Sequence, residues 1–172
     1  MLFWTLLIIL ALQRISELII ARRNERTVLS EGAVEYDREG YRVIVAMHAA
    51  FFLSFIAEYY FLKRSLNTLW PLLLLIIVLA EALRYWAISS LGKYWNTKIL
   101  VIAGTSLISK GPYKYIRHPN YLAVVIEIAV IPLIFSCYIT SVLFTFFNFI
   151  VLRRRIRIEE SALTAESQNR NL

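Results

Sequence analysis

The residues best suited to chemistry lie in a polar stretch, residues 107–122, directly before an apolar segment. Gly111-Pro112 is a turn dipeptide, and Pro119 keeps His118 out of helical geometry while being suited to begin a helix itself. The stretch therefore predicts a loop that carries polar side chains to the mouth of a helix bundle. Those side chains are Tyr113, Arg117, His118 and Tyr121.

A second polar segment, residues 153–160, reads Arg-Arg-Arg-Ile-Arg-Ile-Glu-Glu and follows another apolar run. If that run continues as a helix, Arg155 and Glu159 lie four residues apart on one face, and Glu160 is turned away by about 100°. Taken alone, the segment is also typical of an exposed ladder of salt bridges with basic anchoring at a membrane surface.

The composition indicates that these segments are positioned by a membrane protein. Hydrophobic residues make up 59% of the 172-residue chain and charged residues 18%, whereas a soluble domain carries about 25% charged residues. The net charge of +7 does not indicate nucleic-acid binding, because no basic stripe is interleaved with aromatic residues. The single Cys137 allows no internal disulfide, and no Cys/His cluster has metal-ligand spacing, so we expect no metal.

Five apolar segments predict an all-α integral membrane protein of about five transmembrane helices, forming one membrane domain over residues 1–172. A span must cross about 30 Å of hydrocarbon. The predicted spans are residues 2–21, 42–62, 69–90, 121–136 and 138–152. The first lacks the basic start and cleavage site of a signal peptide, so we expect it to be retained. Pro132 is predicted to kink the fourth span, and a tight turn at 136–140 to join the last two.

Basic residues predict the orientation of these spans, because short cytoplasmic loops are enriched in Lys and Arg. The segments 22–42 and 91–118 and the tail after residue 152 are each rich in Lys and Arg, whereas the remaining loop holds Lys63 and Arg64 alone. Five spans place the three rich segments on one side. We therefore expect the N-terminus outside and the C-terminus in the cytoplasm, with the protein in the cytoplasmic membrane.

Charged residues inside the predicted spans need partners or a wet cavity. Arg14 with Glu17, and Glu81 with Arg84, are three apart on a helix and can pair. Each pair can stabilise the packing of neighbouring helices or can face a ligand, and the sequence leaves both interpretations open.

Three further polar residues stand without an obvious partner in sequence. Glu58 lies beside two tyrosines near the end of its span, which predicts an anchor at the membrane interface. Glu127 must find a partner on another helix or face water. His48 is isolated, and an isolated histidine is more typical of a hydrogen-bonded structural residue than of a functional one.

Together the two polar segments resemble the isoprenylcysteine carboxyl methyltransferase family over about residues 90–163. The likeness rests on the Arg-His-Pro-x-Tyr loop at 117–121 and on Glu159-Glu160 after a helical hairpin, with Arg155 one turn earlier. The N-terminal half is similar to small bacterial members of the family. The resemblance implies that residues 91–163 form the catalytic region and bind S-adenosylmethionine on the cytoplasmic side.

The resemblance also implies a role for each site residue. Leu107 and Ile108 would line the adenine pocket, and Tyr113, His118 and Tyr121 would contact the cofactor. Glu159 would hold the methionine amino group, and Glu160 would support the pocket or bind cofactor. Arg155 would face the methyl acceptor, and Arg117 would brace the loop.

The resemblance thus predicts an O-methyltransferase of a lipophilic acceptor. The acceptor would be a prenylcysteine-like carboxylate or the hydroxyl of a long-chain polyketide pyrone, with a phospholipid amine as a further option. No Gly-rich loop follows a predicted strand, so the soluble methyltransferase architecture is not indicated. Expected partners are membrane lipids and this substrate, with neither nucleic acid nor metal. A non-catalytic scaffold or a small transporter retaining the fold is the alternative.

Overall fold

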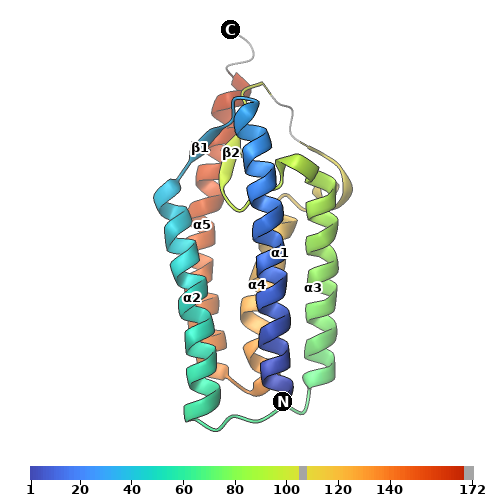
Figure 1. Cartoon of the computed structure of the whole chain (residues 1–172), viewed down its shortest axis with the longest axis vertical. Coiled ribbons are helices and arrows are strands. Elements are labelled where there is room, and N and C mark those ends of the chain that lie inside the picture. Colours follow the sequence, from blue (N-terminus) through green and yellow to red (C-terminus); the bar gives the residue numbers. More distant parts are fainter. Residues whose placement is uncertain (105–107, 169–172) are drawn as a thin grey trace. The chain divides into compact units, whose positions relative to one another are not determined.

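The computed structural model describes residues 1–104 and 108–168 and is mostly helical (Figure 1). The helices and strands are α1 Leu2–Ser30, β1 Val34–Tyr36, α2 Arg38–Phe61, α3 Trp70–Leu91, η1 Gly92–Tyr94, β2 Ile99–Val101, η2 Gly111–Lys114, α4 Pro119–Val130, η3 Pro132–Phe135 and α5 Tyr138–Gln168. The predicted helical membrane fold is confirmed.

Among the described residues, three helical segments are long and apolar enough to cross a membrane: Leu2–Ser30, Arg38–Phe61 and Trp70–Tyr94. The segment Pro119–Phe135 is a shorter apolar helix. Helix α5 continues well beyond the predicted span 138–152, because Arg, Glu and Ala are good helix formers and no Gly or Pro interrupts residues 153–168.

The chain divides into two compact units, and each is described by itself. The first comprises Met1–Arg38, Leu91–Leu107 and Ile158–Leu172. In it, β1 pairs with β2 in antiparallel register, with Val34 opposite Val101 and Tyr36 opposite Ile99. A small core of Ile99, Val101 and Ala162 packs beside this ribbon. The sequence analysis did not predict the ribbon, since three-residue strands carry almost no periodic signal.

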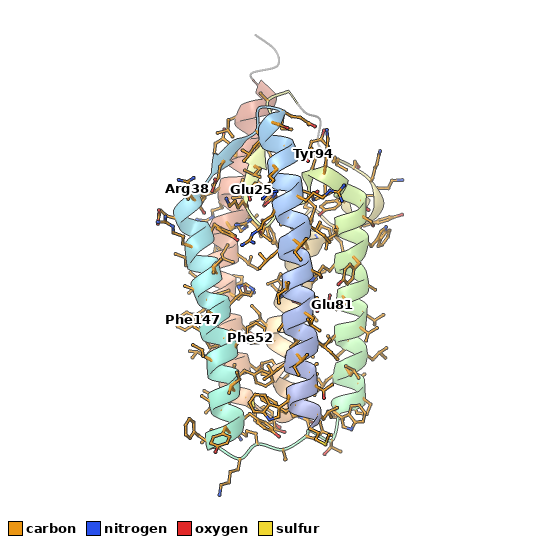
Figure 2. All side chains as sticks on the ribbon, viewed as in Figure 1. Glu25, Arg38, Phe52, Glu81, Tyr94 and Phe147 are labelled. Carbon is orange, nitrogen blue, oxygen red and sulfur yellow. The ribbon has the colours of Figure 1, made fainter. Side chains whose placement is uncertain are left out.

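Polar side chains fasten the segment around η1 and β2 to α1 within the first unit. Asn24 Nδ2 donates to the Trp95 carbonyl at 2.8 Å, and Asn96 Nδ2 donates to the Ala21 carbonyl at 3.0 Å. Lys98 Nζ lies 2.6 Å from a carboxylate oxygen of Glu25, which Figure 2 labels on α1. That hydrogen bond raises the pKa of Lys98 above its ordinary value.

The second unit comprises Glu39–Ser90 and Ile108–Arg157 and has its own apolar core. Phe51 of α2, Val124 and Ile128 of α4, and Phe144 of α5 form this core, and Phe52 packs against it. The Phe51 and Phe144 rings meet edge to face with centroids 5.6 Å apart. Figure 2 labels Phe52 beside α2. The core joins α2, α4 and α5 of the second unit.

The connection between α4 and α5 differs from the predicted kink. Helix α4 ends at Val130, and Pro132 begins the 3-10 helix η3, because a proline has no N–H for the helical ladder and clashes with the preceding turn. Ser136 then adopts a left-handed conformation with φ 54°, and α5 begins at Tyr138. The predicted tight turn is therefore present, but it is completed before Thr140.

Glu58 is buried and caps the N-terminus of α5, a role beyond the predicted anchor at the membrane interface, which stays a prediction. The side chain is 7% exposed. Its oxygens accept hydrogen bonds from the Thr140 backbone N–H at 2.7 Å and the Ile139 N–H at 3.2 Å, and Arg64 donates to it at 3.0 Å. A carboxylate at a helix N-terminus satisfies unpaired N–H groups and complements the helix dipole. The sequence analysis missed this role because the contact joins positions far apart in the chain.

Candidate functional site

The start of the predicted site loop is fixed by a glycine. Gly111 has φ +54°, and a Cβ atom there would collide with Ser90 Oγ and lie 2.9 Å from Trp86 Nε1. The backbone of η2 therefore packs directly on the C-terminal end of α3. Buried Pro112 follows, and its carbonyl accepts the Ile116 N–H at 2.9 Å. Only glycine combines this backbone angle with so close an approach.

His118 and Tyr121 lie side by side where the loop enters α4. His118 is the N-cap residue, with φ −129° and ψ 66°, and Pro119 occupies the first turn. The predicted start of the helix at Pro119 is thus confirmed. The His118 and Tyr121 rings are stacked, with centroids 5.3 Å apart and an interplanar angle of 21°. The loop therefore presents a paired aromatic surface at the start of α4.

Arg155 of α5 joins this aromatic pair. Its Nε donates a hydrogen bond to the Tyr121 hydroxyl oxygen at 2.8 Å, and its guanidinium carbon lies 5.7 Å from the centre of the Tyr121 ring. Although it carries a charge, the residue is 5% exposed. The structure thus brings together three of the predicted site residues, His118, Tyr121 and Arg155, although 34 residues separate the last two.

The remaining predicted residues are placed as follows. Ile108 and Tyr113 are half-buried in the second unit, and Arg117 is exposed. Leu107 lies outside the described residues. Glu159 and Glu160 are half-buried and belong to the first unit. Because α5 is unbroken from Tyr138 to Gln168, Arg155 and Glu159 share a helix face as predicted.

The intramembrane charges form ion pairs within each unit. Arg84 and Glu127, 1% and 2% exposed, form a salt bridge between α3 and α4, and Glu81 lies 3.6 Å from the same arginine. Figure 2 labels Glu81 on α3. Of the two predicted alternatives for Glu127, a partner on another helix or contact with water, the structure shows the partner. In the first unit, Arg14 Nη1 lies 2.7 Å from Glu17 Oε2.

His48 has a local structural contact. Its Nδ1 donates to the Ile44 carbonyl, one turn earlier on α2, at 2.9 Å. This contact agrees with the structural role that the sequence analysis assigned to an isolated histidine.

Sequence reasoning missed the buried polar residue Asn148 of α5. It is 1% exposed, and within the described part of the chain neither its Oδ1 nor its Nδ2 has a hydrogen-bond partner. A signal was present, because Asn148 is a polar residue in the apolar run 142–152. Such residues are costly in a membrane and tend to be functional.

The fold and site define a helical membrane protein with a His–Tyr–Arg constellation at the start of α4. Residues 72–165, more than half of the chain, match the sequence model of the isoprenylcysteine carboxyl methyltransferase (ICMT) family. The chain belongs to this family, as its Arg-His-Pro-x-Tyr loop and Glu-Glu pair predict, and family membership indicates a membrane methyltransferase.

Two bacterial relatives extend the likeness over almost the whole chain. The chain is 46% identical over 161 residues to the uncharacterized protein YpbQ of Bacillus subtilis, covering 94% of this chain and 96% of that one. It is 29% identical over 152 residues to an uncharacterized protein of Haemophilus influenzae, covering 88% of each. No solved structure matches the chain significantly.

Proposed function

We propose that the protein is an S-adenosylmethionine-dependent methyltransferase that O-methylates a lipophilic acceptor at the cytoplasmic face of the membrane. The observation that carries this proposal is the contact of buried Arg155 with Tyr121, beside the stacked His118 ring. It unites the two segments on which the family likeness rests.

The residues present fit the chemistry of S-adenosylmethionine, which carries a sulfonium, an ammonium and a carboxylate. The stacked faces of His118 and Tyr121 suit a cationic or planar group. Following the family, Glu159 accepts hydrogen bonds from the methionine amine, and His118 donates to its carboxylate. Tyr113 contacts the cofactor, Leu107 and Ile108 line the adenine pocket, and Glu160 supports it.

Arg155 binds the methyl acceptor in this proposal. When bound, S-adenosylmethionine supplies the methyl group on its sulfonium sulfur, so that an O–CH3 bond forms as the S–CH3 bond breaks and S-adenosylhomocysteine leaves. Arg155 orients an acceptor carboxylate through paired N–H groups, or lowers the pKa of an enolic hydroxyl so that its proton passes to water. Tyr121 fixes Arg155 for this task, and positioning supplies much of the acceleration.

The surroundings of the site select a lipophilic acceptor. The described chain has three helices able to span a membrane, and the apolar half of α5 leads to Arg155. An acceptor whose polar head reaches Arg155 while its tail stays in lipid fits this arrangement. A prenylcysteine-like carboxylate and the hydroxyl of a long-chain polyketide pyrone both meet the requirement. The distribution of Lys and Arg supports an orientation with the N-terminus outside and the C-terminus in the cytoplasm.

The test is transfer of labelled methyl from S-adenosylmethionine into a bacterial lipid extract by the detergent-purified protein. We expect label in the organic phase with the wild type and a rate of labelling lower by about 100-fold or more with Arg155→Ala. Alkaline hydrolysis then separates acceptors, since a methyl ester releases its label as methanol and a methyl ether does not. Equal labelling by wild type and Arg155→Ala would contradict the proposed role of Arg155.

A further inference from the structure

A single buried stripe runs along α5 within the second unit, from the turn after η3 to the candidate site. Its buried members are Ser141, Phe144, Asn148, Leu152 and Arg155. Several residues between them point outward, as the exposed fractions of Val142 (71%) and Phe149 (60%) show. Asn148 therefore lies on the same side of the helix as Arg155.

Within the described part of the chain, the carboxamide of Asn148 makes no hydrogen bond. Ser141, two turns earlier, donates its hydroxyl to the Ala129 carbonyl at 2.6 Å. Asn148 has no corresponding contact within the described residues, although its amide offers two donors and an acceptor. An unsatisfied polar group in an apolar interior costs free energy that an aliphatic side chain would not. The residue is consequently better explained by a group that the chain does not supply.

The position of Asn148 indicates which group that is. Seven residues separate it from Arg155, which is two helical turns or about 10 Å along the axis. Helical side chains lean toward the N-terminus, so Arg155 leans toward the turn of Asn148. One turn beyond, Phe144 belongs to the apolar core with Phe51 and Val124. Along the stripe, the order is thus a charged group, then a neutral amide, then an apolar region.

We propose that Asn148 is a specificity-determining residue that binds a neutral polar group within the tail of the methyl acceptor. This inference rests on the proposed function, because it places the acceptor head at Arg155. A hydroxyl, carbonyl or amide matches the donors and acceptor of Asn148, whereas a charged group would lack a counter-charge from an amide. The acceptor is therefore a lipid with a second polar group about 10 Å from its methylated oxygen.

The experiment uses octadecanoic acids that carry one hydroxyl at carbon 6, 8, 10 or 12, beside the unsubstituted acid. Calorimetric titration into the detergent-purified full chain gives the Kd of each probe. We expect at least one hydroxy acid to bind the wild type about tenfold more tightly than the parent, as one or two hydrogen bonds allow. In Asn148→Leu that ratio falls to about one. A ratio near one for all hydroxy acids in the wild type, or an unchanged ratio in the variant, would overturn the proposal.

Thermal unfolding of the same variants without probes gives an independent readout. Asn148→Leu should melt at or above the wild-type temperature, because no protein hydrogen bond is lost. Ser141→Ala is the matched control, and it should melt lower while keeping the wild-type ratio of Kd values. If Asn148→Leu melts below the wild type by as much as Ser141→Ala, Asn148 is structural and the proposal is wrong.

Binding of S-adenosylmethionine, titrated into the same preparations, separates this inference from the proposed function. We expect both the wild type and Asn148→Leu to bind it alike. Normal cofactor binding with an unchanged probe ratio in Asn148→Leu overturns the Asn148 assignment alone. A folded wild type that binds no S-adenosylmethionine contradicts the proposed function, and with it the assignment of Asn148 to a methyl acceptor.

Discussion

Two buried arginines of the second unit are held in different ways. Arg84, 1% exposed, is paired with the carboxylate of Glu127 and lies near that of Glu81. Arg155, 5% exposed, donates its Nε to the neutral hydroxyl of Tyr121 and lies over the Tyr121 ring. Both are expensive to bury. Arg84 pairs with carboxylates of α3 and α4, whereas Arg155 contacts the tyrosine of the family's Arg-His-Pro-x-Tyr loop, and we infer a structural role for the first and a functional role for the second.

The two contacts differ in what they do to the guanidinium group. An arginine neutralised by carboxylates on neighbouring helices closes a pair inside the bundle. An arginine whose Nε is fixed by a phenol has an oriented guanidinium, and its planar fork suits a carboxylate or an oxyanion. We therefore expect Arg84 to control stability and Arg155 to control turnover, and the following experiments test that division.

Replacing Arg155 should have the largest effect. Arg155→Ala is expected to lower kcat by about 100-fold or more, because the acceptor loses its orientation, while affinity for S-adenosylmethionine is unchanged. Arg155→Lys keeps the charge but not the planar fork, so we expect partial activity. Single-turnover methyl transfer and calorimetry measure the two properties. If Arg155→Ala retains full turnover, Arg155 belongs with Arg84 as a structural residue.

Breaking the Arg84 pair should reduce stability. Arg84→Met leaves Glu127 buried without its partner and is expected to cost about 3–5 kcal/mol of unfolding free energy. The double variant Arg84→Met/Glu127→Leu removes both charges of the pair and should recover most of that loss. Thermal unfolding in detergent measures the stability of the single and the double variant. Normal stability in the single variant would show that the pair does not hold α3 and α4 together.

A substitution at Gly111 tests whether the loop before α4 must be held in place for the site to work, without changing either arginine. Gly111→Ala must collide with Ser90 and strain a backbone at φ +54°, so we expect a loss of about 1–3 kcal/mol and weaker cofactor binding. Gly104→Ala is the matched control, since its φ is also positive, at +73°, but among the described residues beyond its chain neighbours nothing lies within 4 Å of the added Cβ. Equal cofactor affinity in the two variants would argue against a role for the Gly111 contact in placing the site.

Replacing the buried carboxylate of Glu58 should lower stability by less than breaking the Arg84 pair. Glu58→Gln keeps the shape but removes the negative charge that accepts the Thr140 and Ile139 N–H groups. We expect a loss of about 1–2 kcal/mol in unfolding free energy and no change in cofactor affinity. Thermal unfolding beside a cofactor titration measures both. A loss of cofactor affinity at unchanged stability would remove Glu58 from the structural class.

Much of this fold could be predicted from the sequence, because its signals are local. Apolar length predicted the helices, and Pro119 predicted where α4 begins. Pro132 was recognised as an interruption, although it ends α4 instead of kinking it. The β1–β2 ribbon and the capping of α5 by Glu58 depend on pairings between distant positions, so no local pattern revealed them.

The candidate site was predicted by motif more than by physics. The loop pattern pointed to Tyr121 and helical spacing to Arg155, but their roles came from the family likeness, and their hydrogen bond could not be read from spacing. Asn148 was missed because a neutral amide in an apolar run is a weaker signal than a charged residue. Its burial and its lack of a hydrogen-bond partner within the described residues become known only from the structure. The roles of Glu159, Glu160 and Ile108 toward the cofactor stay predictions.

The most direct measurement is calorimetric titration of S-adenosylmethionine into the detergent-purified wild type and the Glu159→Gln variant. Glu31→Gln, which changes an exposed carboxylate paired with Lys93, serves as the control. We expect saturable binding by the wild type and the control, and none by Glu159→Gln in a protein that remains folded. A folded wild type that does not bind, or a Glu159→Gln variant that binds normally, would contradict this expectation.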